Sequence, residues 1–371
     1  MGAETFSIDE MMNKIQSEID SLQHLNVLLM GKTGAGKSTL INNIFRVKLA
    51  GTGIGQPVTT VTEGYSIPGV PVTIFDTRGF ELGSKEQQLV KTDILRLIKD
   101  GVEAKDINRN IHCILYCLNA ASNRIEEEEI NWIRQFTDEA NVFSVPVVIV
   151  LTQAVAKKKG EDLQAVIEKQ SLKVKGIIPV LAEDYPIDDE LLIKAYGLDR
   201  LIDTMTKVLS AELRLTLQNV QIASLKNKIT EAESAVHKFV AAAGTVAATP
   251  IPFSDAAVLV PVQVAMIARI TAIFGISVTK SILTGIVSSV AGTAGATYIG
   301  RSFVSGILKF IPGIGTIAGG VISAATAAAI TEALGQAYIQ LMIMIYKGEL
   351  EESSVGSDEF KRILKEKMKM L

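Results

Sequence analysis

The chain has 371 residues, which is enough for two or three domains with sizeable cores. Its 37 basic and 40 acidic residues give a net charge of −3, so no nucleic-acid partner is expected, because dedicated nucleic-acid binders carry a basic excess. Two cysteines exclude a disulfide scaffold. The mean hydropathy of +0.30 is high for a globular protein. Residues 239–346 account for the excess, since they carry only six charged side chains.

The first element is an amphipathic helix within residues 1–24. Ser7 and Glu10 have the spacing of a helix-capping box. Apolar residues then recur at helical spacing, with charged residues between them: Ile8, Met11, Met12, Ile15, Ile19 and Leu22. The pattern predicts a helix that packs on a neighbouring element, and it differs from that of a signal peptide.

Residues 25–210 alternate between short apolar runs and charged helical stretches. The runs lie at residues 25–30, 64–67, 70–75, 113–118, 145–151 and 176–181, and the helical stretches include residues 38–45, 84–99, 125–136 and 161–169. This alternation predicts an α/β fold with a doubly wound, mostly parallel sheet. Pro68 and Gly69 join the second and third runs, which predicts an antiparallel hairpin at one edge.

A phosphate-binding loop follows the first predicted strand. The segment Gly31–Thr39 matches the pattern G-x-x-x-x-G-K-[ST] and lies between a strand and a helix. Its glycines allow backbone N–H groups to surround phosphate oxygens, and the helix N-terminus adds partial positive charge. Lys37 is the catalytic cation of the pattern, and the Ser38 hydroxyl is a ligand for Mg²⁺. The predicted nucleotide contacts are Gly31, Lys32, Thr33, Gly34, Ala35, Gly36, Lys37, Ser38 and Thr39.

A second motif follows about forty residues later. The apolar run Val72–Phe75 ends at Asp76, and Asp76 and Gly79 form the pattern D-x-x-G. An aspartate at a strand end beside a phosphate loop can hold Mg²⁺. Gly79 is expected to bring its backbone N–H to the terminal phosphate and to move when that phosphate is lost.

With these motifs the chain resembles the translation-factor-type GTPases, in particular the Era/TrmE/septin-like group, over about Leu25–Leu209. The strings GKTGAGKSTLINNIF, GQPVTT and FDTRGFE are most similar to bacterial Era-like, immunity-related and chloroplast import-receptor GTPases. The resemblance implies a P-loop GTPase fold, GTP or GDP as ligand with Mg²⁺, and a threonine that senses the metal and the terminal phosphate. Thr59 or Thr60 takes that catalytic and metal-binding role, with Thr62 as a weaker candidate. Alternatively, these threonines belong to an edge strand.

The chain departs from this family at two places. Phe80 stands where small signalling GTPases carry the glutamine that orients water, so intrinsic hydrolysis is expected to be slow or to need a group from elsewhere. The guanine-reading pattern [N/T]-K-x-D appears as Thr152-Gln153-Ala154-Val155 and lacks its aspartate. Thr152 fits, Gln153 is expected to lie along the base, and Ala182 offers a backbone N–H to it. ATP therefore stays an alternative to GTP.

The remaining chain is predicted to be helical. Residues 211–238 are expected to form a linking helix, residues 239–347 an apolar helical module, and residues 348–371 a polar linker with a basic amphipathic helix. Residues 281–300 and 310–331 are uncharged, but they are rich in Gly, Ala, Ser and Thr. The alternatives are a compact bundle that touches a membrane, a soluble bundle, and spanning helices. The module resembles a helical domain of unknown function found after Era-like GTPase domains.

Two functions are consistent with the sequence. The first is a slow GTP-hydrolysing switch whose C-terminal residues 239–371 contact a membrane surface or a protein partner. The second is a nucleotide-dependent scaffold that does not hydrolyse GTP and forms a homodimer across its nucleotide face, as septin-like relatives do. Both predict a cytoplasmic protein, and the first predicts peripheral membrane association.

Overall fold

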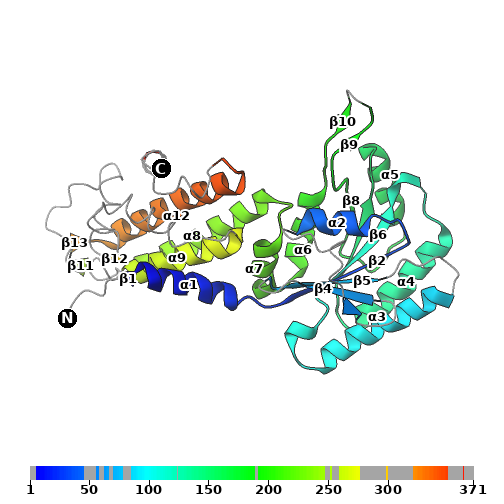
Figure 1. Cartoon of the computed structure of the whole chain (residues 1–371), viewed down its shortest axis with the longest axis horizontal. Helices are drawn as coiled ribbons and strands as arrows, with labels where there is room; N and C mark the ends of the chain where they lie inside the picture. Colours follow the sequence, from blue (N-terminus) through cyan, green and yellow to red (C-terminus); the bar gives the residue numbers. More distant parts are fainter. Residues whose placement is uncertain are drawn as a thin grey trace. The chain divides into compact units, whose positions relative to one another are not determined.

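The computed structural model describes residues 6–45, 56–57, 62–66, 70–77, 85–122, 124–188, 191–246, 251–252, 259–275, 298–299, 321–349 and 362. The chain divides into two compact units (Figure 1). Residues Leu22–Asn227 form one, which we call the α/β unit. The other, the helical unit, combines Met1–Ser21 with Lys228–Leu371.

A seven-stranded sheet forms the α/β unit, in the order β3-β4-β5-β2-β6-β7-β8. The five strands from β5 to β8 are parallel, and β3 and β4 continue the sheet antiparallel at one edge. The predicted mostly parallel sheet and its antiparallel hairpin β4–β5 are thus confirmed, whereas the two-residue strand β3 was not expected. The strands are β2 (Leu25–Gly31), β3 (Gln56–Pro57), β4 (Thr62–Ser66), β5 (Val72–Thr77), β6 (Cys113–Asn119), β7 (Val147–Thr152) and β8 (Gly176–Pro179).

Helices cover both faces of this sheet. Alternate residues of β2 show the division, since Val27 and Leu29 face one apolar cluster and Leu28 and Met30 face the other. The first cluster includes α2 (Lys37–Ile44), α6 (Leu198–Val208) and α7 (Ala211–Val220). The second includes α3 (Lys85–Glu103), α4 (Glu127–Val142) and α5 (Lys157–Glu168). Because both faces are covered, the central strands β2, β6 and β7 are mostly apolar.

The predicted linking helix 211–238 is interrupted. It is replaced by α7 and α8 (Leu225–Val246), and Gln221 between them has an extended backbone. The Gln221 amide accepts from Ser224 N at 2.8 Å and donates to Ser224 O at 3.0 Å. These side-chain hydrogen bonds compete with helix continuation. Helix α7 joins the apolar core through Leu213, Leu217 and Val220, so the α/β unit extends beyond the predicted boundary at residue 210.

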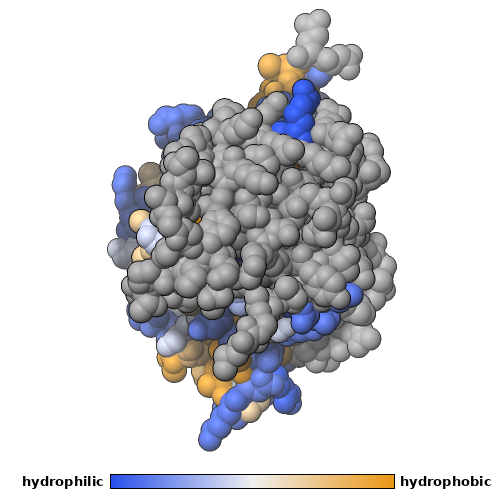
Figure 2. Space-filling model, turned by 90° about the vertical axis from the view of Figure 1, so that its left-hand side faces the viewer, coloured by the Kyte–Doolittle hydropathy of each residue, from blue (hydrophilic) through white to orange (hydrophobic). Residues whose placement is uncertain are grey.

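A short hairpin follows the sheet of the α/β unit. Strands β9 (Tyr185–Pro186) and β10 (Leu192–Ile193) pair antiparallel. Its large apolar side chains are unusually exposed, with Tyr185 at 47%, Ile187 at 51% and Leu191 at 54%. Figure 2 shows hydrophobic and hydrophilic atoms side by side at the top of the view, where this hairpin lies. The hairpin therefore presents a surface on which apolar and polar side chains are mixed.

Four described helices make up most of the helical unit: α1 (Ile8–Asp20), α8, α9 (Val260–Phe274) and α12 (Ala324–Tyr346). Two-residue strands also pair, β1 (Phe6–Ser7) with β12 (Tyr298–Ile299) and β11 (Ile251–Pro252) with β13 (Val321–Ile322). Helices α8 and α12 pack closely, since a Cβ on Gly335 would lie 2.6 Å from Val236 Cγ2. Among the described helices, only α12 is long and apolar enough to cross a membrane, and 56% of its most apolar window is buried.

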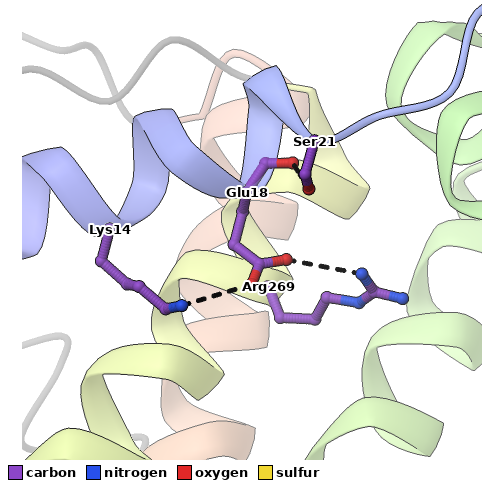
Figure 3. Close-up of polar contacts among 4 residues, drawn as sticks. All are labelled: Lys14, Glu18, Ser21 and Arg269. Carbon is purple, nitrogen blue, oxygen red and sulfur yellow. Dashed lines mark hydrogen bonds and ion pairs between the residues drawn. The ribbon is translucent and has the colours of Figure 1, made fainter.

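The N-terminal helix packs against α9, about 250 residues away in sequence. Met11 and Ile15 bury their side chains there, as the amphipathic pattern predicts. Arg269 of α9 forms an ion pair with Glu18 at 3.4 Å, and Lys14 approaches the same carboxylate at 3.9 Å (Figure 3). The neighbour of the predicted amphipathic helix is thus a distant part of the chain.

A fully buried lysine closes one end of α9. Lys228 of α8 is 0% exposed and donates hydrogen bonds from Nζ to Ile273 O at 3.1 Å and Phe274 O at 3.0 Å. These are carbonyls of the last helical turn, which lack partners inside the helix and carry partial negative charge. The ammonium also lies 5.9 Å from the Tyr346 ring centroid. Burial of this charge is therefore compensated by the helix end and an aromatic face.

Residues 281–300 lie outside the described residues, apart from Tyr298 and Ile299, as do residues 310–320 of the second uncharged segment. The predicted basic helix at residues 358–371 lies outside them as well, apart from Arg362.

Candidate functional site

The phosphate loop connects β2 to α2 and depends on glycine at its two ends. Gly31 has φ +146°, and a Cβ there would lie 2.3 Å from the backbone oxygen of Cys117 on β6. Gly36 precedes α2 with φ 74°, in the left-handed region. Side chains are excluded at Gly31 by the neighbouring strand and disfavoured at Gly36 by backbone strain. The local sequence thereby fixes a tight turn into the helix N-terminus.

A cavity of about 510 Å³ opens beside this loop. Loop residues 34–39 line it, together with Glu63, Tyr65, Asp76, Thr77 and Gln153. Lys37 Nζ donates to Gly31 O at 3.2 Å, within the loop itself. The structure thus brings Lys37, Ser38 and Asp76, which the sequence predicted as phosphate and metal ligands, to one cavity.

Asp76 has the properties of a metal ligand. Its Oδ1 is buried and has no hydrogen-bond partner among the described residues. Burial raises the pKa of this carboxyl to about 6, although Lys37 lowers it, and Glu63 raises it further. A buried carboxylate oxygen without a donor is costly unless a cation or another donor occupies the site. Ser38 lines the same cavity, so the residues present fit a Mg²⁺ ion.

Glu63 and Tyr65 also line this cavity, and the sequence did not indicate them. Glu63 pairs with Asp76 in the register of β4 and β5, which puts two carboxylates side by side. The Tyr65 hydroxyl donates to Glu63 Oε2 at 2.7 Å, and this hydrogen bond raises the pKa of Tyr65 to about 12. The hairpin register could have placed Glu63 opposite Asp76, but only the fold shows which side chains face the cavity.

Thr152 and Gln153 hold the phosphate loop from the side of the sheet. The Thr152 hydroxyl lies 2.6 Å from Ala35 O and 3.0 Å from Leu118 O. Gln153 donates from Nε2 to Gly34 O at 2.9 Å and accepts from Asn119 Nδ2 at 3.3 Å. Gln153 also has φ 53°, an uncommon backbone conformation for a residue other than glycine. Both polar side chains are thus engaged with protein groups.

A second cavity of about 290 Å³ adjoins the loop on the side of the predicted base-reading residues. Its lining includes Ala182, whose backbone N–H the sequence assigned to the base, and two residues that the sequence did not single out, Glu183 and Tyr185. Its lining is Gly36, Thr39, Ala121, Thr152, Gln153, Val155, Val180, Leu181, Ala182, Glu183 and Tyr185.

Lys32 lines neither of these two cavities. Its Nζ forms ion pairs with Glu129 at 2.8 Å and Glu126 at 3.7 Å, which belong to the start of α4 and the residue before it. The Glu129 side chain is only 7% exposed, so the inner pair is well shielded from water. Lys32 and Thr33 line a separate cavity of about 490 Å³. The Lys32 side chain therefore anchors the loop, and a nucleotide contact would come from the backbone of these residues.

Thr59, Thr60 and Gly79, the predicted switch residues, lie outside the described residues, as do Arg78 and Phe80.

Two protein families match the chain. Residues 26–153 match the family described as 50S ribosome-binding GTPase. Residues 212–366 match a domain of unknown function (DUF697). The first match contains the phosphate loop, Asp76 and Thr152, and the second contains all of the helical unit described above except its N-terminal part.

Several curated proteins are similar to part of the chain. The probable GTP-binding protein EngB of Kosmotoga olearia is 27% identical over 158 residues, 42% of this chain and 77% of that protein. Septin-9 of Rattus norvegicus is 26% identical over 148 residues, 33% of this chain and 26% of that protein. Magnetosome membrane protein 22 of Magnetospirillum gryphiswaldense is 28% identical over 109 residues, 29% of this chain and 56% of that protein. The chain thus spans about a quarter of the septin and about half of the magnetosome protein. The chain thus carries a GTPase domain over residues 26–153, with similarity to EngB and to a septin, followed by a domain of unknown function over residues 212–366.

Proposed function

We propose that the chain is a Mg²⁺-dependent guanine-nucleotide switch with slow intrinsic GTP hydrolysis. The observation that carries the proposal is the cavity in which Lys37, Ser38 and the unpartnered Asp76 Oδ1 meet. Lys37 would exchange the carbonyl of Gly31 for phosphate oxygens, and the loop N–H groups would bind the others. Ser38 and Asp76 would hold Mg²⁺. When bound, the ion supplies positive charge beside the outer phosphates.

The proposed switch depends on loss of the terminal phosphate. Thr59 or Thr60 and the Gly79 N–H are the proposed sensors of that phosphate. Phe80 offers no group that could orient the attacking water, which is the reason to expect slow turnover.

The helical unit is the proposed output, and the chain connects it to the α/β unit twice. Residues 22–24 lead from α1 directly into β2 and the phosphate loop, while α7 leads into α8. Within the α/β unit the two connections are tied, because Thr216 of α7 donates from Oγ1 to Gln23 O at 2.7 Å. A change at the phosphate loop would thus act on both connections. The apolar composition of residues 239–346 and the similarity to a magnetosome membrane protein support a membrane surface as the target.

Nucleotide binding and GTP turnover, measured with Mg²⁺ or EDTA and with or without anionic liposomes, test this proposal. We expect slow turnover that needs Mg²⁺, and liposome binding that differs between GDP and a non-hydrolysable GTP analogue. Lys37→Ala should abolish both nucleotide effects. If Lys37→Ala binds liposomes as the wild type does, in a manner independent of nucleotide, the switch is contradicted.

A scaffold is the second candidate, favoured by Phe80 and by the similarity to Septin-9. It predicts no turnover under any of these conditions. It also predicts a homodimer through the GTPase domain that forms only with nucleotide, which light scattering with and without GDP would detect.

A further inference from the structure

The second cavity, of about 290 Å³, lies beside the predicted base-reading residues and is called the base-side cavity here. Among its described lining residues it has a single carboxylate, that of Glu183. The position where the family pattern has its base-reading aspartate is Val155, which offers no polar side chain. Thr152 and Gln153 are engaged with the phosphate loop and Asn119, as described above. The cavity therefore needs another group if it is to read the edge of a base.

The fold brings Glu183 close to the position of the missing aspartate from a different loop. Ala154 N donates to Val180 O at 3.2 Å, so the segment after β8 runs beside residues 153–155. Leu181 exchanges two backbone hydrogen bonds with Tyr196, at 2.9 and 3.0 Å, which fixes the segment from its other side. Glu183 follows two residues later and faces the cavity, with Ala182 beside it.

The neighbouring carboxylate, that of Asp184, binds other groups of the protein. Asp184 forms an ion pair with Lys194 at 2.8 Å and accepts from Ala195 N at 2.8 Å, so it holds the β9–β10 hairpin and does not line the cavity. Glu183 has no ion-pair partner among the residues that the structure describes. Its carboxylate is therefore available to a ligand.

We propose that Glu183 is the specificity-determining residue of the base site, accepting hydrogen bonds from the ring N1–H and the 2-amino group of guanine, with the Tyr185 ring against one face of the base. The inference rests on the proposed function, because it requires a guanine nucleotide in this site. A carboxylate has two oxygens that match two neighbouring donors. Adenine presents an unprotonated N1 at the corresponding edge, which would face the carboxylate with an acceptor, so the same residue selects against ATP.

Base analogues isolate this contact. Inosine nucleotides keep the N1–H but lack the 2-amino group, and xanthosine nucleotides carry a carbonyl oxygen in its place. We expect the wild type to bind GDP about 10-fold more tightly than IDP, since one hydrogen bond to a charged group is lost. In Glu183→Ala the GDP to IDP affinity ratio should fall close to one. Glu183→Gln should shift preference toward XDP, because its amide N–H can donate to the carbonyl.

Asp184→Asn is the matched control, since it changes a neighbouring carboxylate of the same loop outside the cavity. It is expected to leave the GDP to IDP ratio unchanged, even if a looser hairpin weakens both ligands equally. Calorimetric titration of all four proteins with GDP, IDP, XDP and ADP gives the ratios. IDP binding by Glu183→Ala shows that the variant is folded. If Glu183→Ala keeps the wild-type ratio, the role of Glu183 is overturned while the proposed function stands. If the wild type binds no guanine nucleotide, the proposed function fails instead.

Discussion

The α/β unit and the helical unit both bury polar side chains, but for different purposes. In the α/β unit, buried Thr152 donates to Ala35 O of the phosphate loop, and buried Glu129 of α4 forms an ion pair with Lys32 of the same loop. In the helical unit, Lys228 closes the end of α9, and Thr271 pairs with Tyr338 at 2.7 Å between α9 and α12. Buried polar side chains hold the phosphate loop in the first unit. In the second unit they bind the end of one helix and join two neighbouring helices.

This difference implies that substitutions of polar residues should have different effects in the two units. Polar changes in the α/β unit should alter ligand binding more than stability. Those in the helical unit should alter stability and leave nucleotide affinity unchanged. Four substitutions or changes of condition test that separation.

Lys37→Ala should weaken GDP binding by roughly 100-fold or more, because a charge-assisted contact to phosphate is lost. The midpoint of thermal unfolding without nucleotide should change little, since the hydrogen bonds that Lys37 makes to the described residues go to backbone oxygens of its own loop. Fluorescence titration with a labelled GDP measures the affinity. The control is Lys99→Ala, which removes an exposed cation far along α3 and should bind as the wild type does.

Lys228→Ala should lower the free energy of unfolding by about 3 kcal/mol, since it leaves a cavity and two carbonyls without their donor. Lys228→Met should cost less, because it keeps the volume of the stem. Urea unfolding followed by circular dichroism measures both. The matched control is Lys226→Ala, an exposed lysine two residues earlier on α8. An equal loss for Lys226→Ala and Lys228→Ala, or weaker GDP binding by Lys228→Ala, would break the comparison.

Lowering the pH from 7 to 5 should destabilise the α/β unit through His24 and His112. Burial lowers the pKa of both from the usual 6.5, so below that pH the unfolded chain binds more protons at these residues than the folded chain does. Asn26 N also donates to His112 Nδ1 at 2.9 Å, and protonation of that nitrogen would remove this acceptor. Each histidine contributes at most about 1.4 kcal/mol per pH unit.

Urea unfolding at pH 7.5 and 5.5 tests this, with His112→Gln as the comparison. The wild type should lose more stability between the two pH values than the variant. The raised pKa of Asp76 acts in the opposite direction and is common to both proteins, so it cancels in the difference. A variant with the same pH-dependent loss as the wild type would contradict the role of His112.

The smallest effect is expected at the contact between α1 and α9. A double-mutant cycle of Glu18→Gln and Arg269→Gln should give a coupling energy of about 0.5 kcal/mol, because both side chains are partly exposed, at 22% and 38%. The coupling should shrink in high salt. A coupling indistinguishable from zero at low salt would show that Met11 and Ile15, not the ion pair, hold the N-terminal helix.

Patterns of a few residues predicted much of the α/β unit. The alternation of apolar runs located the strands, and Pro68-Gly69 located the antiparallel hairpin, because both are local effects of side-chain period and turn geometry. The phosphate-loop pattern brought Lys37 and Ser38 to the cavity, since its glycines determine the backbone. The break between α7 and α8 was not expected, because glutamine is a common helix residue. The structure shows that the Gln221 amide instead forms hydrogen bonds with the backbone of Ser224.

Local sequence patterns were enough to predict the main strands and helices of the α/β unit, the turn at Gly31 and Gly36, and the contrast between a charged first part and an apolar second part. These depend on residues close together in the chain. Three other contacts follow from the tertiary structure alone: Gln153 donates to Gly34 O, Glu183 lines the same cavity as Gln153, and α1 packs against α9. Each joins residues that lie far apart in the sequence or on different loops. The repeat of apolar residues along a single strand or helix does not predict such contacts, because they form only when the sheet and the helices pack.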